Sequence, residues 1–266
     1  MSQLDIIIKK YDKSLLWLIV ALCGIGTVML YSASSFKSLY QTSGLTDTIY
    51  LQSHLKKMMI GFFGMFLFTV MDYRKLKIAA PYILILSIIL LMLTKLIYII
   101  KGSSSAARWL DLGVISIQTA DFARFSIIVY FAYYIDKKRN QIKDFYTGIA
   151  PPLFILGIIS LLIIIQPDFS SAAVIGFIGF LMLLIGGAKI SHLTASATSA
   201  LIILVPVMLM MPYRMKRITY WISSIFGGSD SATKSLGYQA QQSLISLGNG
   251  GLLGLGPGNR ANPIRY

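Results

Sequence analysis

Charged residues are scarce in this sequence, and cysteine and histidine are nearly absent. Only 13% of the 266 residues are charged, whereas soluble domains carry about 25%. Cys23 is the single cysteine, which excludes a disulfide framework and a cysteine-based metal site. His54 and His192 are isolated and give no metal-ligand spacing. The sequence contains no Walker loop, GxSxG or HExxH motif, so local motifs assign no activity and no cofactor, and they leave a divalent metal undecided.

Long apolar runs take the place of the missing charge, and 56% of the residues are hydrophobic. Seven runs are long enough, or nearly so, to cross a bilayer, which needs roughly 20 apolar residues. They are about Leu15–Ser34, Leu55–Met71, Ile78–Ile100, Thr119–Ile135, Gly148–Ile165, Ser171–Gly187 and Leu193–Met211. The sequence therefore predicts an all-α polytopic membrane protein, with a transmembrane domain over residues 1–211.

Basic residues predict the orientation of these spans. A net charge of +14 in a membrane protein is first a topology signal, and we predict no nucleic-acid partner. With the N-terminus in the cytoplasm, eleven basic residues fall in cytoplasmic segments and five in the outer loops before the seventh run. This bias favours a cytoplasmic N-terminus and predicts that residues 212–266 form an extracytoplasmic loop.

The last polar segment, Gly237–Asn259, differs from all the apolar runs before it. A glycine-rich backbone of this kind cannot face lipid, so we expect it to be irregular and to be held by protein or to face water. It is either a substrate-facing segment or an ordinary surface loop. Its turn at Gly248–Gly251 can offer backbone N–H groups to a phosphate. The substrate-binding candidates in this segment are Gln239, Gln242, Ser243, Gly250 and Gly251.

A few polar residues lie within or between the apolar runs, where charge is costly. Asp121 and Arg124 are three apart, so a helix places them on one face, either as a structural ion pair or as part of a site. Pro167 should end the fifth span. Asp168 then either caps the next helix or shapes an outward-facing cavity. Lys95 is expected to reach the outer interface.

Further basic residues are predicted in the outer segments. Arg108 and Trp109 lie in the second outer loop, where the arginine suits a phosphate or a lipid headgroup and the tryptophan suits the interface. Arg214 and Arg217 follow the seventh run, at the level where a lipid diphosphate would lie. Binding to anionic membrane lipids is the alternative for this pair.

Four separated segments together resemble the SEDS family, the polytopic group of FtsW, RodA and SpoVE. They are YSAS at 31–34, RWLDLG at 108–113 with QTADFAR at 118–124, QPDFSSA at 166–172, and GYQAQQSLISLGNGGLLGLG at 237–256. The sequence departs from the family pattern at five positions. Thr119, Ala120, Asp121, Arg124 and Asn249 stand where that pattern has proline, serine, glutamate, lysine and serine. The acid–base pair keeps its charges, but its geometry must shift because arginine is not equivalent to lysine.

The resemblance implies a peptidoglycan glycosyltransferase of the bacterial cytoplasmic (inner) membrane. Such an enzyme polymerises lipid II and works with a class B penicillin-binding protein, surrounded by membrane lipids. The resemblance also implies ten spans, so this chain is expected to hold seven of them and the first part of the next outer loop. The resemblance implies that the family's catalytic aspartate lies beyond Tyr266, so the catalytic residue is left unassigned. Gly254–Asn259 is more similar to the FtsW and SpoVE branch than to RodA.

Two other functions stay open from the sequence. A lipid II flippase is one, although transporters usually contain repeat-related broken helices near the midplane, and no internal repeat is evident here. The polar residues gather at the predicted outer face instead, which favours chemistry there. A non-catalytic membrane scaffold for cell-wall synthesis proteins is the other, because the expected aspartate is absent from these residues.

Overall fold

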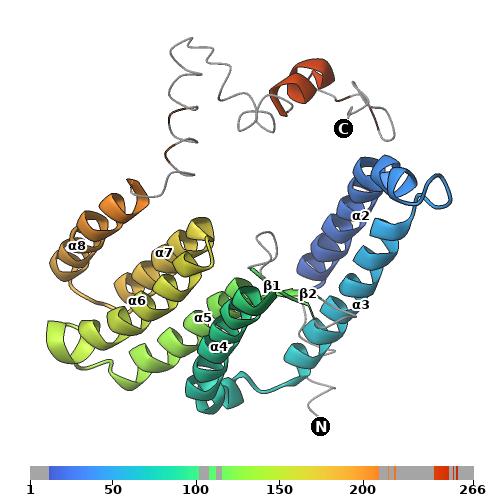
Figure 1. The fold of residues 1–266 in the computed structure, drawn as a ribbon. Coiled ribbons are helices and arrows are strands. Elements are labelled where there is room, and N and C mark those ends of the chain that lie inside the picture. Colours follow the sequence, from blue (N-terminus) through green and yellow to red (C-terminus); the bar gives the residue numbers. More distant parts are fainter. Residues whose placement is uncertain are drawn as a thin grey trace, which may run out of the picture. The chain divides into compact units, whose positions relative to one another are not determined.

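The computed structural model describes residues 12–101, 108–111, 116–209, 215, 219, 243–251, 254 and 256. Helices form nearly all of the secondary structure, and they occur where the apolar runs predict them (Figure 1). The chain divides into two compact units. One unit contains Met1–Val70 and Ile202–Tyr266, and the other contains Met71–Leu201.

A helical hairpin forms the described beginning of the first unit. α2 (Lys13–Gln41) starts after Asp12, whose carboxylate accepts a hydrogen bond from the N–H of Ser14 at 2.9 Å and so caps the helix. The chain then turns through Gly44, which has a φ of 90° that favours glycine. α3 (Ile49–Val70) runs back along α2.

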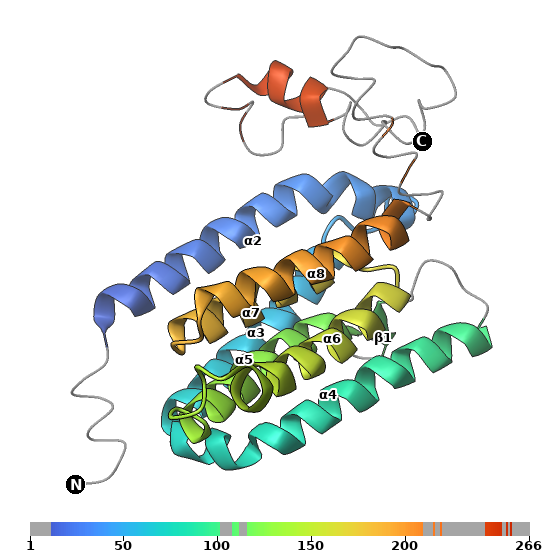
Figure 2. The same cartoon turned by 90° about the vertical axis from the view of Figure 1, so that its left-hand side faces the viewer.

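Four helices of the second unit pack around one core. They are α4 (Tyr73–Lys101), α5 (Thr119–Lys137), α6 (Ala150–Ile165) and α7 (Phe169–Ile185). α4 packs on α5, and α7 packs on both α5 and α6 (Figure 2). Fully buried side chains from all four helices fill the core: Leu91, Ile127, Phe131, Ile159, Ile163, Ile175 and Leu183. This core fixes the helix ends that carry the polar residues described below.

Small residues allow these helices to approach closely. A Cβ atom added at Gly179 of α7 would lie 2.8 Å from a methyl carbon of Leu156 on α6 and 3.2 Å from the ring of Phe131 on α5. Ser126 of α5 donates a buried hydrogen bond of 2.9 Å to the hydroxyl of Ser87 on α4. Both features are typical of helix contacts in membranes, where small side chains and interhelical hydrogen bonds hold helices together.

A π-helical turn, η1 (Phe145–Ile149), leads directly into α6. Asp144 caps it by accepting hydrogen bonds from the N–H of Thr147 at 3.0 Å and from its hydroxyl at 2.7 Å. Pro151 and Pro152 follow in the first turn of α6, where a missing N–H costs no helical hydrogen bond. The prolines therefore mark the beginning of α6 rather than a break in it.

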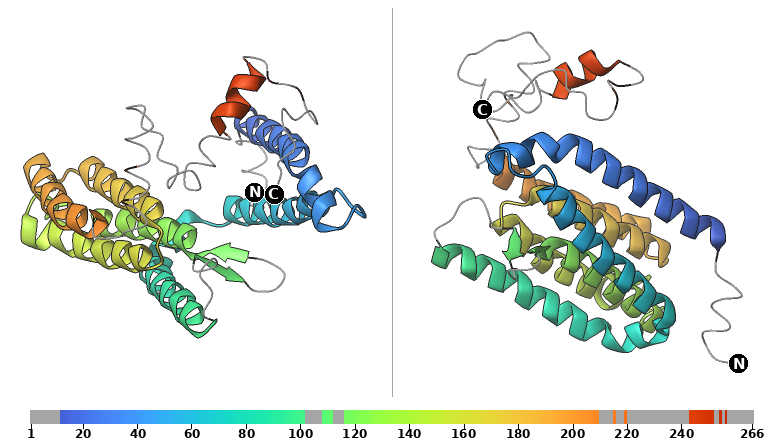
Figure 3. Two further views of the ribbon diagram at one scale, coloured as in Figure 1. Left: turned by 45° about the horizontal axis from the view of Figure 1, so that its top comes forward. Right: turned by 90° about the vertical axis from the view of Figure 1, so that its right-hand side faces the viewer.

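A short antiparallel hairpin between α4 and α5 departs from the all-helical prediction (Figure 3). β1 (Trp109–Asp111) pairs with β2 (Ser116–Gln118), and Trp109 lies opposite Gln118. Each strand has three residues, which is too short for an alternating pattern to stand out in the sequence. The hairpin brings the segment beginning at Arg108 to the start of α5.

All seven predicted spans correspond to helices, and the last of them is α8 (Ile190–Leu209). The first differs most, because α2 continues beyond the predicted end at Ser34 to Gln41. By length and composition alone, three described helices can cross a membrane: α2, α4 and the continuous helix Phe145–Ile165. The prediction of an all-α, multi-pass membrane protein is confirmed.

Candidate functional site

Asp168 is the centre of a buried polar cluster at the turn between α6 and α7. Its side chain is 3% exposed. It caps α7, as the sequence predicts, by accepting hydrogen bonds from the N–H of Ser171 at 3.3 Å and from its hydroxyl at 2.8 Å. The Ser170 hydroxyl donates at 3.2 Å, and the Gln118 side-chain amide donates at 3.2 Å from the end of β2. Residues from two separate parts of the chain therefore satisfy this carboxylate.

Arg108 approaches the same turn from the start of β1. Its guanidinium donates a hydrogen bond of 2.5 Å to the backbone carbonyl of Pro167 and lies 4.0 Å from a carboxylate oxygen of Asp168. Nevertheless, 46% of the arginine side chain remains exposed. Because a guanidinium carries five N–H donors, Arg108 is held on one side and keeps donors available for a ligand.

Lys95 of α4 is a second cation held at this turn. Its ammonium donates a hydrogen bond of 3.3 Å to the carbonyl of Ile165, the last residue of α6. It also lies 5.0 Å from the centre of the Tyr98 ring. A cation at a helix C-terminus is favourable because the last carbonyls have no partner within the helix. Lys95 is thus bonded to the end of α6. The sequence analysis predicted its position near the interface but not this contact.

Gln166 belongs to the cluster, although the sequence analysis did not select it. Its side chain is buried, and its amide nitrogen donates a hydrogen bond of 2.8 Å to the carbonyl of Leu91 in α4. Its side-chain oxygen has no hydrogen-bond partner among the described residues. A signal was present in the sequence, because Gln166 stands directly before Pro167 at the end of an apolar run, where a polar side chain is unusual.

Hydrogen bonding and charge lower the pKa of the Asp168 carboxyl. Burial raises this pKa, but the hydroxyl and backbone N–H of Ser171 stabilise the carboxylate, and the Arg108 guanidinium adds its positive charge. The pKa of Asp168 therefore lies below its ordinary value. Asp168 is an ionised anchor at neutral pH and not a proton donor.

Asp121 and Arg124 form the predicted ion pair, with 3.0 Å between a guanidinium nitrogen and a carboxylate oxygen. The pair lies near the start of α5, shortly after Gln118. Asp121 is in the first turn, where a negative charge is favourable. Its side chain is 57% exposed and that of Arg124 is 34% exposed. The pair is consequently a feature of the bundle surface at the same end as Asp168.

Two of the four segments that carry the family resemblance thus meet at one end of the bundle. Arg108 and Gln118 come from the second segment, and Asp168 comes from the third. Trp109 pairs with Gln118 across the hairpin and is 48% exposed. Arg108 lies beside the buried carboxylate and Lys95 is held at the end of α6 in the same turn, so this end carries two cations that can bind an anion such as a phosphate. Among the described residues no group of histidine, cysteine, aspartate and glutamate has the arrangement of a metal site.

The C-terminal candidates are only partly described. Arg214, Arg217, Gln239 and Gln242 lie outside the described residues. Ser243 and Gly250 lie in a helix over residues 243–250, and Gly251 follows it with a φ of 55°.

The expectation of irregular backbone is therefore wrong for residues 243–250. The Ser-Leu-Ile-Ser-Leu sequence sustains a helix, and Gly251 takes the left-handed conformation that commonly ends one. Helical N–H groups beyond the first turn are directed to carbonyls of the preceding turn. A phosphate-binding nest at Gly248–Gly251 is accordingly not supported.

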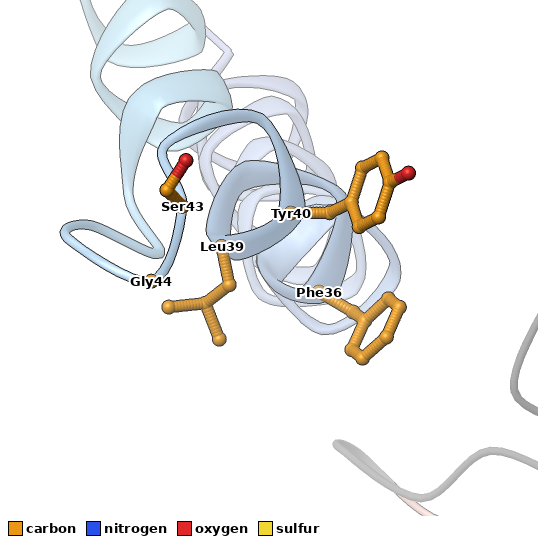
Figure 4. Close-up of a pocket in the computed structure, with 5 residues that line it drawn as sticks. All are labelled: Phe36, Leu39, Tyr40, Ser43 and Gly44. Atoms are coloured by element: carbon orange, nitrogen blue, oxygen red, sulfur yellow. The ribbon is translucent and has the colours of Figure 1, made fainter.

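A hollow of about 600 Å³ lies at the end of α2 in the first unit (Figure 4). Phe36, Leu39, Tyr40, Ser43 and Gly44 line it. Phe36 and Leu39 point to the same open side, and none of the five residues carries a charge at neutral pH. This hollow has no cation to pair with a phosphate, whereas Arg108 and Lys95 are held at the α6–α7 turn.

Comparison with known proteins identifies the family. A model of the family described as cell cycle protein (FtsW/RodA/SpoVE) matches residues 13–266. The Probable peptidoglycan glycosyltransferase FtsW of Geobacter sulfurreducens is 32% identical over 260 residues, which cover 97% of this chain and 68% of that protein. The protein of the same name from Buchnera aphidicola is 31% identical over 266 residues, covering 96% and 62%.

The corresponding protein of Escherichia coli O6:H1 is 31% identical over 264 residues, covering 96% of this chain and 60% of that protein. The chain thus spans between about three fifths and two thirds of the length of these curated relatives. Their names agree with the predicted FtsW branch. The resemblance seen in the sequence segments is confirmed: the chain belongs to the FtsW/RodA/SpoVE family of cell cycle proteins.

Proposed function

We propose that the protein containing this chain is a peptidoglycan glycosyltransferase that polymerises lipid II during cell division. The observation that carries the proposal is Arg108, which is anchored on Pro167 and Asp168 and still presents half of its side chain. Family membership and the names of the relatives support the reaction. Lipid II is a lipid diphosphate, and an anchored arginine with free donors is the protein group best suited to that chemistry.

Glycosyl transfer needs a base for the acceptor hydroxyl and positive charge for the departing diphosphate. This chain supplies the second requirement through Arg108 and Lys95, whose positions are fixed by the carbonyls of Pro167 and Ile165. Cations held before the substrate arrives need little reorganisation during the reaction, which is the basis of electrostatic catalysis. The base is the aspartate that the resemblance implies beyond Tyr266.

The proposed location is the bacterial cytoplasmic (inner) membrane, with the N-terminus in the cytoplasm. The excess of basic residues in the segments assigned to the cytoplasm supports this orientation. The end of α4, the start of α5 and the α6–α7 turn then lie on the outer side, where glycan strands are built. A class B penicillin-binding protein is the proposed partner, on the basis of the family resemblance.

Polymerisation of radiolabelled lipid II by the purified full-length protein tests this function. Arg108→Ala should reduce polymer about 100-fold, which is the usual loss when one preorganised donor to a developing negative charge is removed. Lys143→Ala is the matched control, because it removes an exposed cation at the other end of the bundle. Full activity in Arg108→Ala, or an equal loss in both variants, would contradict the proposal.

Lipid II flipping is the second candidate, and the Asp121–Arg124 pair in α5 favours it because charges within spans often mark a substrate path. A flipping assay in proteoliposomes, run beside the polymerisation assay, distinguishes the two functions. Transport without polymer would identify a flippase, and the absence of both activities would favour a scaffold.

Reversing the charges of Arg214 and Arg217 should also abolish polymer while the protein still inserts into the membrane.

A further inference from the structure

A groove of about 610 Å³ lies between α4 and α5 at the end of the bundle opposite to Asp168. It involves the first turns of α4, near Lys77, and the second half of α5, whereas the Asp168 cluster contacts α4 at Lys95. The 18 residues that separate Lys77 from Lys95 correspond to about 27 Å of helix. The groove is therefore separate from the proposed catalytic end.

The floor of the groove is apolar and leads along the helices. Leu76 of α4 and Ile128, Val129 and Ala132 of α5 contribute to it. Ile128 is 40% exposed, so its side chain is not covered by the bundle. In a protein that crosses a membrane, an open apolar channel along two helices is surface that lipid chains can fill.

The rim of the groove is basic and aromatic. Arg74 and Lys77 lie on the α4 side, and Tyr73 of α4 and Tyr133 of α5 also line the groove. Tyrosine is enriched at membrane interfaces, where its ring meets the headgroups. Rim and floor together thus have the polarity profile of one phospholipid, with the headgroup level beside the helix ends and the chain level further along them.

The charges of the rim favour an anionic headgroup. Lys77 forms an ion pair with Asp136, and both side chains are more than half exposed. No acidic side chain pairs with Arg74 in the part of the chain that the structure describes. Lys137 follows on α5, with its ammonium 3.1 Å from the Tyr133 hydroxyl. Cations therefore outnumber acids around the groove, and basic pockets between membrane helices are typical headgroup sites.

We propose that this groove binds an anionic phospholipid of the bilayer. Its phosphate contacts Arg74 and Lys77, and one acyl chain lies along Ile128, Val129 and Ala132. A soluble anion would use the rim alone, whereas the lipid uses rim and floor together. In the proposed orientation the site faces the cytoplasmic leaflet, and it holds α4 and α5 together at the end remote from the reaction.

Native mass spectrometry of the detergent-purified full-length protein tests the site. The probes are phosphatidylglycerol and phosphatidylcholine with identical acyl chains, and glycerol phosphate as the headgroup without chains. Wild type should retain phosphatidylglycerol in preference to the other two. The double variant Arg74→Gln/Lys77→Gln should weaken phosphatidylglycerol binding about 25-fold, because each cation near a membrane surface contributes about fivefold.

Three further variants keep the test decisive if the double variant is poorly folded. Asp136→Asn should strengthen phosphatidylglycerol binding, since Lys77 loses its competing carboxylate. Ala132→Trp should weaken binding of both lipids by filling the floor. Lys143→Gln/Lys189→Gln removes the same charge from exposed positions outside the groove and should change nothing.

Four results would overturn the proposal. The first is equal binding of the two lipids to wild type, and the second is unchanged phosphatidylglycerol binding in the double variant. The third is an equal loss in the control variant, which would indicate net charge instead of a site. The fourth is displacement of the lipid by glycerol phosphate at equal concentration, which would show that the apolar floor contributes nothing.

Discussion

Two aspartates cap helices at opposite ends of the α4–α7 bundle, and their surroundings differ. Asp144 precedes η1 and forms its hydrogen bonds with Thr147, three residues further on. Asp168 precedes α7, is buried, and accepts a hydrogen bond from Gln118, which is 50 residues away in the chain. Asp144 thus stabilises only its own helical turn at the surface, whereas Asp168 connects separate elements inside the protein.

The difference indicates where function lies. Burying a carboxylate is costly unless hydrogen bonds and an opposite charge offset the loss of water. Asp144 shows that this chain can cap a helix without such a cost. The burial of Asp168 also holds Arg108 in place, and the exposed donors of Arg108 are not needed for capping α7. The buried cap therefore positions the arginine of the proposed site, whereas the exposed cap forms hydrogen bonds only within its own turn.

Replacing the buried cap should produce the largest effect. Asp168→Ala removes the acceptor of the Ser171 and Gln118 hydrogen bonds and releases Arg108. We expect a loss of about 3 kcal/mol in the free energy of unfolding, because buried donors remain unpaired. Thermal unfolding in detergent measures the stability, and lipid II polymerisation should fall with it. Unfolding at the wild-type temperature would contradict the assigned role.

Asp168→Asn sharpens this prediction through its pH dependence. The pKa of Asp168 is lowered in the folded protein, so its stabilising contribution is complete above the unfolded pKa of about 3.9. That contribution is lost as the pH falls through the lower, folded pKa. Wild type should consequently lose stability below about pH 4, and the asparagine variant should lose less over the same range. Parallel acid curves for the two proteins would remove Asp168 as the cause.

Gln166 offers the next largest effect at the buried end. Gln166→Glu places a carboxylate against the Leu91 carbonyl and removes the donor, and we expect a loss of about 2 kcal/mol. Gln166→Leu removes the hydrogen bond together with the unpaired oxygen, so it should cost less than about 1 kcal/mol. Thermal unfolding ranks the two variants. If leucine is the more damaging substitution, an unpaired buried charge is not the dominant cost at this position.

Local features of this fold could be predicted from the sequence. Apolar runs locate every one of the seven helices, because a spanning helix satisfies its own backbone and is apolar along its length. The cap at Asp168 and the ion pair of Asp121 with Arg124 follow from spacing within a few residues. These features need no knowledge of which helix packs against which.

Long-range contacts could not be predicted in this way. The hydrogen bond of Gln166 to Leu91 joins residues 75 apart, and that of Lys95 to Ile165 joins residues 70 apart. Both depend on how α4 lies against α6, which periodicity does not encode. The Gly248–Gly251 segment was mispredicted because its glycines were weighted above the helix-forming residues before them.

Asp144 should be the weaker of the two caps. Asp144→Ala removes the acceptor of the Thr147 bonds, and these hydrogen bonds join no separate elements. We expect a fall in the melting temperature of about 2 °C and unchanged polymerisation, since water replaces the lost partners. The same thermal unfolding assay measures it beside Asp168→Ala. Equal effects of the two substitutions would break the distinction between the ends of the bundle.

The Asp121–Arg124 pair lies at the same end as Asp168 but is only partly buried, with side chains 57% and 34% exposed. It therefore tests whether burial or location decides the role of a charged group. A double-mutant cycle on stability should give a coupling of only about 0.5 kcal/mol, as for other exposed pairs on one helix. Each single change should nevertheless lower polymerisation if this end binds lipid II. The swapped variant Asp121→Arg/Arg124→Asp should recover part of that activity, though not all, because arginine in the first turn opposes the helix dipole.

If the swapped variant is no more active than either single variant, direct pairing of Asp121 with Arg124 does not matter. If the singles are fully active, location at this end is insufficient, and the site is confined to the buried residues around Asp168.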